Sequence, residues 1–483
     1  MRQTFSLSRD DVFLAVTTLS FDIAALELYL PLLVGARLSV VSRNIAQDGI
    51  QLGHYLTSER VSVMQATPAT WKILLESGWQ GNPQLKILCG GEALDGKLAQ
   101  QLLKRGKEVW NLYGPTETTI WSSVYRVEFP VRKSEVGKRN TEKGNDLTTE
   151  LPQDAACLMP SSIPIGRPIA NTQFYVLDDY LQQLPVGVPG QLYISGAGLA
   201  RGYLNAPDLT AQKFIPNPFR KELGIANSEF RIQNSEKGIL YQTGDLVRYR
   251  SDGTLDYLGR IDTQVKLRGF RIELKEIEAV LMQHPEVKQA VVTLDKDKQD
   301  ERLIAYVAIL PAAVSTFSTT DLRRFLEAKI PAYMLPSAYV ILEKLPLTPN
   351  GKIDRKALPT PEATRPDLEV GYVKPKTQVE QTIAQIWQQV LQIEKIGLHD
   401  NFFDLGGHSL LMVKVHSKLR EQFTSNISLV EMFRYPTISA LTTYFSRADN
   451  DSDLSQEVNS RNDQIVAGKE RLRQRLQQRT AKP

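Results

Sequence analysis

Residues 400–411, with the sequence DNFFDLGGHSLL, place a single hydroxyl group just before an expected helix. Asp404, Gly406 and Gly407 are turn-forming residues, and an apolar run follows Ser409. The first turn of a helix offers unpaired backbone N–H groups and the positive end of the helix dipole, which together suit a phosphate. Ser409 is therefore a candidate attachment point for a phosphate-linked group, although a serine at such a place is more often only a helix cap.

A second candidate site is the segment NLYGPTETT at residues 111–119. Tyr113 could stack on an adenine ring, and Thr116 and Thr118 could donate hydrogen bonds to phosphate oxygens. Glu117 offers the hard oxygen ligand that Mg²⁺ prefers. A purely structural turn would account for the same residues equally well.

Two further segments carry charges that would suit a nucleotide. In YQTGDL, at 241–246, Asp245 follows a glycine and could accept hydrogen bonds from both hydroxyls of a ribose, or could simply cap a turn. GRIDTQVKLRGFRIE, at 259–273, adds Arg260 near that ribose and Asp262 at the junction of two expected domains. Taken singly, each of these charges is more typical of a solvated surface.

The composition narrows the class of protein. A chain of 483 residues with 42% hydrophobic and 23% charged residues is long enough for about three globular domains. The net charge of +4 gives no reason to expect a nucleic-acid or membrane partner. Two cysteines are too few for a disulfide framework, and we find neither a secretion signal nor an apolar run of about 18 residues. We therefore expect a cytoplasmic protein.

Hydrophobic patterning predicts the elements that would position these residues. From residue 13 to about 257, short β-rich runs (VSVMQAT, LKILCGG, VWNLY, TQFYVLD, GQLYISG) alternate with amphipathic stretches such as 95–104, which indicates an α/β core. The polar stretch 130–160 is predicted to be a surface loop.

The C-terminal half is predicted to contain two smaller domains. A turn into a strand at 259–271, a helix at 273–282 and strands near 287–294 and 303–310 indicate a small α+β domain. A Pro-rich linker follows at 359–375. Apolar spacing then predicts helices at 377–392, 410–419 and 438–445, hence a helical bundle of about 70 residues.

The order of these motifs resembles that of nonribosomal peptide synthetases. The resemblance covers about residues 10–446 and includes both the adenylation domain and the carrier domain of these enzymes. Their adenylation domains belong to a wider family with acyl-CoA ligases and luciferases. The matching segments are FDIAALEL (21–28), NLYGPTE, GQLYISGAGLARGYL (190–204), YQTGDLVR, GRIDTQVKLRGFRIE, IPAYMLP (330–336) and NGKIDR (350–355). DNFFDLGGHSLL resembles the 4′-phosphopantetheine attachment site of their peptidyl carrier domains.

The resemblance implies a fold and a division of the chain. It predicts a partial adenylate-forming-enzyme core of the α/β class at 1–260 and an α+β C-terminal subdomain at 261–360. A linker at 361–374, an all-α four-helix carrier domain at 375–446 and a disordered polar tail at 447–483 complete the chain.

The resemblance also implies a role for each candidate residue. Lys352 would bridge the amino-acid carboxylate and the α-phosphate, Asp262 would be the hinge of the C-terminal subdomain, and Ser409 would carry phosphopantetheine. Glu117 would hold Mg²⁺. The remaining positions would bind ATP or AMP: Gly91, Asn111, Tyr113, Thr116, Asp245 and Arg260.

The resemblance assigns an amino-acid pocket as well. Asp22 would pair with the α-ammonium group of the substrate. The other pocket positions are Ile23, Leu26, Gln65, Leu88, Gly90, Leu112, Ile120 and Trp121, with Lys352. Trp121 would fill the side-chain space, which resembles glycine-activating domains; packing in a core is the alternative role for this residue. Alanine is the nearest competitor, because one methyl group gives only about 1–3 kcal/mol of discrimination.

One motif of the family is not found. Adenylation domains carry a Gly-rich phosphate-binding loop upstream of FDIAALEL, and no such loop occurs among residues 1–20. We therefore expect a truncated core with an open sheet edge and exposed apolar surface. Signatures of condensation (HHxxxDG) and thioesterase (GxSxG) domains are also not found.

The expected function is activation of an amino acid, with glycine as the expected one, by ATP and Mg²⁺. The aminoacyl-AMP product would be loaded as a thioester on the carrier domain. A phosphopantetheinyl transferase and other synthetase domains, in cis or in trans, are the expected partners. One alternative is a carrier loaded in trans, without adenylation of its own. Another is an acyl-CoA ligase, which Asp22 and the carrier motif disfavour.

Overall fold

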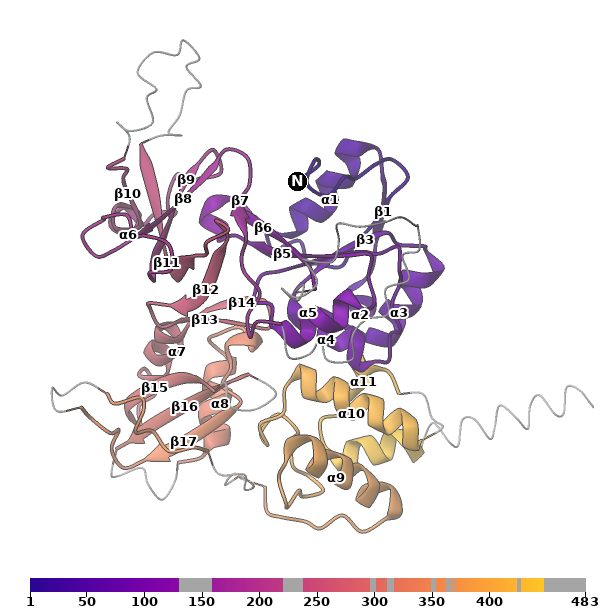
Figure 1. The fold of residues 1–483 in the computed structure, drawn as a ribbon. Helices are drawn as coiled ribbons and strands as arrows, with labels where there is room; N and C mark the ends of the chain where they lie inside the picture. The colour runs from indigo at the N-terminus through magenta and orange to yellow at the C-terminus, as the bar shows by residue number, and fades with distance from the viewer. Residues whose placement is uncertain are drawn as a thin grey trace, which may run out of the picture. The chain divides into compact units, whose positions relative to one another are not determined.

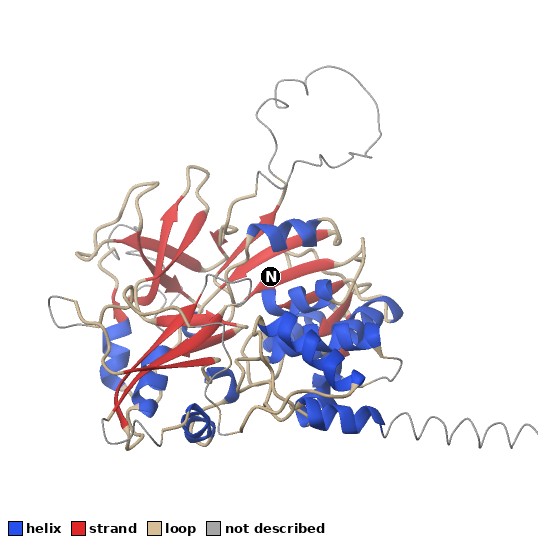
Figure 2. Cartoon of the chain, turned by 90° about the horizontal axis from the view of Figure 1, so that it is seen from below, coloured by secondary structure: helices blue, strands red, loops and turns tan. Residues whose placement is uncertain are grey.

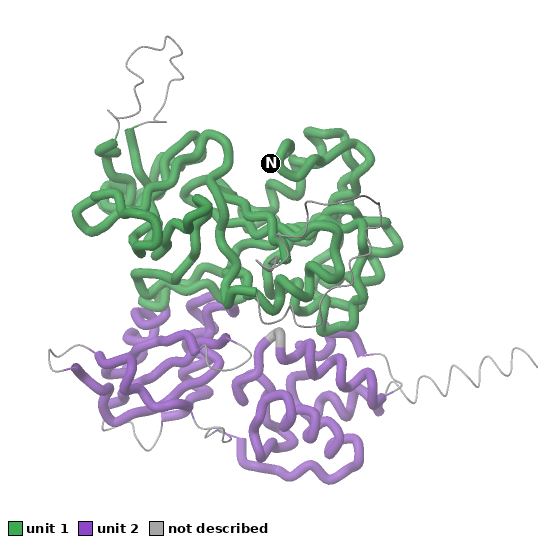
Figure 3. Tube along the Cα trace, viewed as in Figure 1, with its two compact units in different colours: residues 1–276 green, residues 277–483 purple. Residues whose placement is uncertain are grey.

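The computed structural model describes two compact units, Met1–Glu276 and Ile277–Pro483 (Figure 3). The described residues are 1–129, 159–219, 238–295, 301–310, 317–348, 353–361, 365, 368, 370–423 and 427–446. The predicted loop at 130–160 lies almost wholly outside them, as do Lys352, part of the linker and the tail at 447–483. The predicted boundaries at residues 260, 360 and 374 stay predictions.

A seven-stranded sheet forms the centre of the first unit (Figure 1). Its order is β2-β1-β3-β4-β5-β6-β7, parallel from β2 to β5 and antiparallel from β5 to β7. The strands are β1 (Val12–Ala15), β2 (Arg37–Val40), β3 (Val63–Ala66), β4 (Lys86–Gly90), β5 (Glu108–Tyr113), β6 (Ser123–Val127) and β7 (Arg167–Pro168). The predicted α/β core is confirmed.

Helices pack on both faces of this sheet, because successive strand residues point to opposite sides. The helices are α1 (Ala24–Val34), α2 (Arg43–Gln47), α3 (Gly49–Ser58), α4 (Pro68–Glu76) and α5 (Gly96–Leu103). In β4, Ile87 and Cys89 join a buried cluster with residues of α3, α4 and α5. Leu88, between them, joins a second cluster with residues of α1. The strand therefore divides its side chains between two cores.

The seven-stranded sheet has β2 at one edge and β7 at the other. β2 is its terminal strand, and its residues are exposed or half-buried. Tyr29, Leu32 and Leu33 of α1 are also exposed. Exposed apolar side chains and the outer edge of β2 therefore occur in the same part of the first unit.

A second, five-stranded antiparallel sheet and a hairpin complete the first unit. The sheet has the order β10-β11-β9-β8, with β12 paired to β11. Its strands are β8 (Thr172–Leu177), β9 (Gly190–Gly196), β10 (Phe214–Pro216), β11 (Ile239–Tyr249) and β12 (Leu255–Arg260), and α6 spans Pro207–Lys213. The hairpin consists of β13 (Gln264–Leu267) and β14 (Phe270–Glu273).

The second unit contains a three-stranded sheet and a set of helices, which Figure 1 labels and Figure 2 colours red for strands and blue for helices. The sheet comprises β15 (Val287–Asp295), β16 (Arg302–Ile309) and β17 (Ala338–Leu342), with α7 (Leu274–Leu281) at the start and α8 (Thr319–Glu327) before β17. The predicted helix and two strands are confirmed. β17 was missed; it pairs with β16 in parallel.

The carrier region is helical throughout its described elements. α9 (Gln378–Leu391), α10 (Ser409–Gln422), α11 (Leu429–Arg434) and residues 438–446 form four helical segments, which confirms the predicted all-α class. Trp387, Phe402 and Leu419 are buried between them. No helix in the described part of the chain is long and apolar enough to cross a membrane.

Candidate functional site

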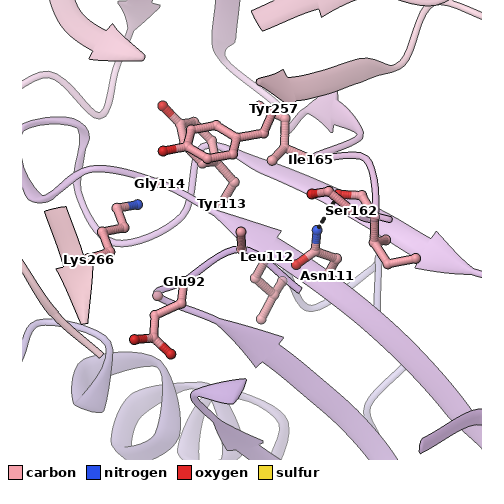
Figure 4. A pocket seen from close by; sticks show the side chains of 12 residues that line it. Glu92, Asn111, Leu112, Tyr113, Gly114, Ser162, Ile165, Tyr257 and Lys266 are labelled. Carbon is pink, nitrogen blue, oxygen red and sulfur yellow. Dashed lines mark hydrogen bonds between the residues drawn. The ribbon is translucent and has the colours of Figure 1, made fainter. Parts of the chain in front are cut away.

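A pocket lies where the parallel strands β4 and β5 end (Figure 4). Small ligands bind in α/β proteins at this end of the strands. Segments from β12 and β13 and the turn before β7 contribute the remaining walls. The lining residues are Gly91, Glu92, Ala93, Asn111, Leu112, Tyr113, Gly114, Ser162, Ile163, Ile165, Tyr257 and Lys266.

The amide of Asn111 is oriented by the backbone of the neighbouring turn. Its Nδ2 donates to the carbonyl oxygen of Pro164 at 2.8 Å and, more weakly, to that of Ile163 at 3.4 Å. The side chain is buried, so this orientation is fixed within the pocket wall. The Oδ1 atom is thereby left as an acceptor.

Tyr113, Asp245 and Arg260 form a buried chain of hydrogen bonds beside the pocket. The Tyr113 hydroxyl donates to Oδ2 of Asp245, and Nη1 of Arg260 donates to Oδ1 of Asp245 at 2.8 Å. Asp245 is only 1% exposed. Burial, followed by the charge of Asp245, raises the pKa of Tyr113 well above its ordinary value. Each Asp245 oxygen still has a second acceptor position for a further donor.

The other side of the Arg260 guanidinium is bound by Asp262. Nε donates to Oδ1 at 2.7 Å, and Nη2 donates to Oδ2 at 2.6 Å. Burial acts to raise the pKa of Asp262, but the hydrogen bonds and charge of Arg260 leave it below its ordinary value. Asp262 therefore belongs to the Met1–Glu276 unit and is anchored there by two hydrogen bonds.

Glu117 is held by a tyrosine and an arginine. It lies in the 3₁₀ helix Thr116–Thr118, and its carboxylate accepts from the Tyr203 hydroxyl and from Nη1 of Arg271, each at 2.7 Å. Burial acts to raise its pKa, but Arg271 and the tyrosine hydroxyls leave the pKa lowered. Thr116 is exposed, whereas Thr118 is buried and bonded to Ser122 and to a backbone carbonyl.

The β13–β14 hairpin brings a lysine into the pocket, which the sequence did not predict. Nζ of Lys266 lies 5.4 Å from the centroid of the Tyr113 ring (Figure 4). Burial lowers the pKa of this ammonium group. Among the described residues, Lys266 makes no ion pair, whereas Arg260 and Arg271 are both paired with carboxylates.

The tip of the same hairpin is fixed against the pocket wall. The backbone N–H of Gly269 donates to Oε1 of Glu92 at 2.6 Å. Gly269 has a φ of +84°, and a Cβ there would lie 2.8 Å from Cγ2 of Thr67. A side chain at this position would therefore strain the turn and clash with Thr67.

The predicted amino-acid pocket residues come together around α1 and β4. Ile23, Leu26, Leu88, Leu112 and Trp121 share one buried cluster, with Ile120 packed against it. Trp121 lies against Gly90, where an added Cβ would be 2.4 Å from its Cη2 atom. Gln65 bonds to the Trp121 indole, and Asp22 lies half-buried just before α1.

In the carrier region, Ser409 is the first residue of α10. His408 occupies the cap position, and its Nδ1 accepts from the N–H of Leu411 at 3.4 Å. The capping role considered for Ser409 therefore belongs to His408. Gly406 has a φ of +90°, and a Cβ on Gly407 would lie 2.3 Å from the Phe402 ring, so the turn before Ser409 requires both glycines.

Comparison with known families identifies three domains. Residues 1–204 match the AMP-binding enzyme family, 276–352 match the AMP-binding enzyme C-terminal domain, and 381–445 match the phosphopantetheine attachment site. The chain belongs to the AMP-binding enzyme family of the nonribosomal peptide synthetase type, with an adenylation domain followed by a carrier domain.

The relatives that the chain resembles include peptide synthases of two bacteria. Over 451 residues the chain is 42% identical to the dimodular nonribosomal peptide synthase of Bacillus subtilis (strain 168), covering 93% of this chain and 17% of the relative. It is 40% identical to tyrocidine synthase 3 of Brevibacillus parabrevis over 452 residues, covering 93% of this chain and 6% of that protein. The chain thus spans less than a fifth of the length of either relative.

One similar solved structure contains the same two kinds of domain. It is a holo nonribosomal peptide synthetase protein containing adenylation and PCP domains, bound to a vinylsulfonamide inhibitor. The TM-score is 0.64 at 25% identity, covering 90% of this chain and 65% of that protein.

Proposed function

We propose that this chain activates an amino acid as an aminoacyl adenylate and loads it onto its own carrier domain. The observation that supports this most is the Tyr113–Asp245–Arg260 chain beside a pocket at the ends of β4 and β5. The carrier helix that begins at Ser409 belongs to the same polypeptide. A nucleotide site and an attachment site are what the two reactions need.

The pocket residues suit an adenine nucleotide. The free Oδ1 of Asn111 can accept a hydrogen bond from the purine amino group, and Tyr113 offers a ring face for stacking. The remaining acceptor positions of Asp245 suit ribose hydroxyls, which matches the use of acidic residues in other nucleotide sites. Gly91 allows the backbone to approach the base, and Thr116 and Arg260 complete the proposed set.

Mg²⁺ would be held by Glu117 together with phosphate oxygens of the nucleotide. No group of three or more His, Cys, Asp or Glu side chains suited to a metal occurs among the described residues. One carboxylate nevertheless fits, because Mg²⁺ is commonly bound by one or two carboxylates plus substrate phosphates. The ion would neutralise charge on the phosphates.

The N-terminal turn of α10 suits the phosphate of a phosphopantetheine arm on Ser409, because backbone N–H groups gather there. When attached, the arm supplies the thiol that takes the aminoacyl group as a thioester, with AMP leaving. A phosphopantetheinyl transferase would install the arm. Condensation or other synthetase domains would use the loaded carrier.

Glycine is the proposed amino acid. Asp22 would hold the α-ammonium group, and Trp121 against Gly90 would leave little room for a side chain. Lys352 would stabilise the charge that develops as the substrate carboxylate attacks the α-phosphorus and pyrophosphate leaves. Asp262 would be the hinge residue.

Intact-mass spectrometry tests this proposal. The chain is incubated with a phosphopantetheinyl transferase and CoA, then with ATP, Mg²⁺ and glycine. A pantetheine increment followed by a glycyl increment is the expected result. A pantetheine increment alone, with no amino acid producing pyrophosphate exchange, would favour a carrier loaded in trans. Release of a free CoA thioester by the Ser409→Ala chain would favour an acyl-CoA ligase.

A further inference from the structure

Glu27 is a fully buried carboxylate in α1 to which no role above has been assigned. It is 0% exposed, and it accepts four hydrogen bonds. Its Oε2 accepts from the backbone N–H groups of Val16 at 2.9 Å and Thr17 at 3.0 Å. Its Oε1 accepts from the Thr17 hydroxyl and from Nε2 of Gln65 at 2.9 Å.

Gln65 connects this carboxylate to the amino-acid pocket. Its Nε2 also donates to the carbonyl oxygen of Ile23 at 2.9 Å, and its Oε1 accepts from the Trp121 indole N–H at 2.8 Å. Gln65 is 0% exposed and Trp121 is 3% exposed. Two pocket residues, Ile23 and Trp121, are therefore tied to Glu27 through one amide.

The carboxylate of Glu27 determines how the side-chain amide of Gln65 is oriented. All four neighbouring groups donate to the carboxylate oxygens of Glu27, so the amide of Gln65 turns its NH₂ group toward them and toward the Ile23 carbonyl. Its carbonyl oxygen then faces the indole N–H of Trp121, which only donates. A neutral amide in place of Glu27 would turn a donor toward the Gln65 NH₂ group and weaken this preference, leaving the Ile23 carbonyl as its remaining acceptor.

The hydrogen bonds from Glu27 through Gln65 determine the position of the Trp121 ring. The indole lies so close to Gly90 that a Cβ there would be 2.4 Å from Cη2. A large ring packed against a glycine closes the space at the end of β4. Rotation of the ring away from Gly90 would open that space.

We propose that Glu27 is a positioning residue for amino-acid selectivity, which holds Trp121 against Gly90 through Gln65 so that only the smallest side chains are accepted. This inference rests on the proposed function, because it concerns the substrate of the same site. Glu27 does not touch the substrate; it acts through Gln65 and Trp121.

The test is the near-isosteric substitution Glu27→Gln, assayed by amino-acid-dependent pyrophosphate exchange with glycine and alanine. We expect the glycine-to-alanine ratio of kcat/KM to fall about tenfold, mostly through a lower KM for alanine, while kcat for glycine changes little. One methyl group gives about 10- to 200-fold discrimination in an apolar pocket, so such a loss is measurable. Glu128→Gln, at an exposed position in the same unit, is the matched control.

A second variant tests the inference if Glu27→Gln fails to fold, and a second measurement tests it if the chain has no exchange activity. Trp121→Phe keeps an aromatic ring but removes the donor to Gln65, and we expect the same loss of discrimination. Indole N–H exchange, followed by ¹⁵N NMR and assigned with Trp121→Phe, is expected to be faster at Trp121 in Glu27→Gln than in the parent chain.

The outcomes separate the inference from the proposed function. No exchange activity of the parent chain with any amino acid contradicts the proposed function, and the indole exchange then decides whether Glu27 positions Trp121. An active parent whose selectivity is unchanged in both variants overturns the inference alone. An equal loss for glycine and alanine, or a parent chain that prefers a large amino acid, also overturns it.

Discussion

Lys266 is expected to bind the phosphate of a nucleotide in the pocket. Its ammonium group lies over the Tyr113 ring and makes no ion pair within the described residues, while the two nearby arginines are neutralised by carboxylates. A partly buried cation without a partner gains most from an anionic ligand, and the phosphate is the anionic part of AMP. The informative change is Lys266→Met, which keeps a long apolar stem and removes the charge.

The expected magnitude follows from the loss of one charged hydrogen bond. Such a bond contributes about 1.5–3 kcal/mol, which corresponds to about a 10- to 150-fold increase in the Kd for AMP. Adenosine has no phosphate, so its Kd is expected to change less than about threefold. AMP and adenosine therefore respond differently to the same substitution.

A pH series supplies an independent signature. Because burial lowers the pKa of Lys266, the preference for AMP over adenosine is present below that pKa and is lost as the pH rises through it. The series starts above pH ~7, where the AMP phosphate is fully ionised. In Lys266→Met the preference is expected to be flat over the same range.

Isothermal titration calorimetry with AMP and adenosine measures both Kd values. Lys97→Met, at an exposed lysine of α5, is the matched control and is expected to bind both ligands as the parent does. An equal increase in the Kd values for AMP and adenosine would show that Lys266 contacts the adenosine part of the ligand or stabilises the fold. An unchanged Kd for AMP would refute the prediction that the Lys266 ammonium group binds the phosphate.

Three further predictions concern the carrier, the proposed catalytic lysine and the Asp245 ion pair. Ser409→Ala is expected to abolish the pantetheine mass increment, whereas Ser417→Ala on the same helix should accept it; modification of the first variant would disprove the assignment. Lys352→Ala should reduce pyrophosphate exchange by about 10²- to 10³-fold with unchanged circular dichroism, and an unaltered rate would remove its catalytic role. Arg260→Met should lower the free energy of unfolding by about 3–5 kcal/mol, because it leaves the buried Asp245 carboxylate unpaired. Urea denaturation measures this loss; adding Asp245→Asn should recover part of it, and a loss below about 1 kcal/mol would contradict the argument.

Local sequence patterns predicted the elements of the fold better than the contacts of the site. The β-rich runs of β4 and β5 and the helical spacing of α9 depend on neighbouring residues only, and the structure confirms them. Motif order predicted that Leu88 and Trp121 lie in one pocket, and the structure places both in one buried cluster. β17 was missed because its strand character depends on pairing with β16.

The roles proposed for Glu27 and Lys266 depend on contacts between residues far apart in the sequence. Glu27 is the one charged residue of the otherwise apolar helix α1, but its partner Gln65 lies 38 residues away in the sequence. Lys266 is one charge among several in its segment, and only the hairpin turn brings it to Tyr113. Lys266 carries no local signal, and the single charge in α1 marks Glu27 without indicating which residues it contacts.

The pairing of Glu117 with Arg271 makes metal binding at this carboxylate an exchange reaction. A divalent cation that takes Glu117 must displace a guanidinium that is already bound at 2.7 Å. The apparent metal affinity would then be reduced by the free energy of the ion pair, and free Mg²⁺ would compete poorly without a nucleotide. The released Arg271 could turn to the phosphates that accompany the metal, so that nucleotide and metal would bind with positive cooperativity.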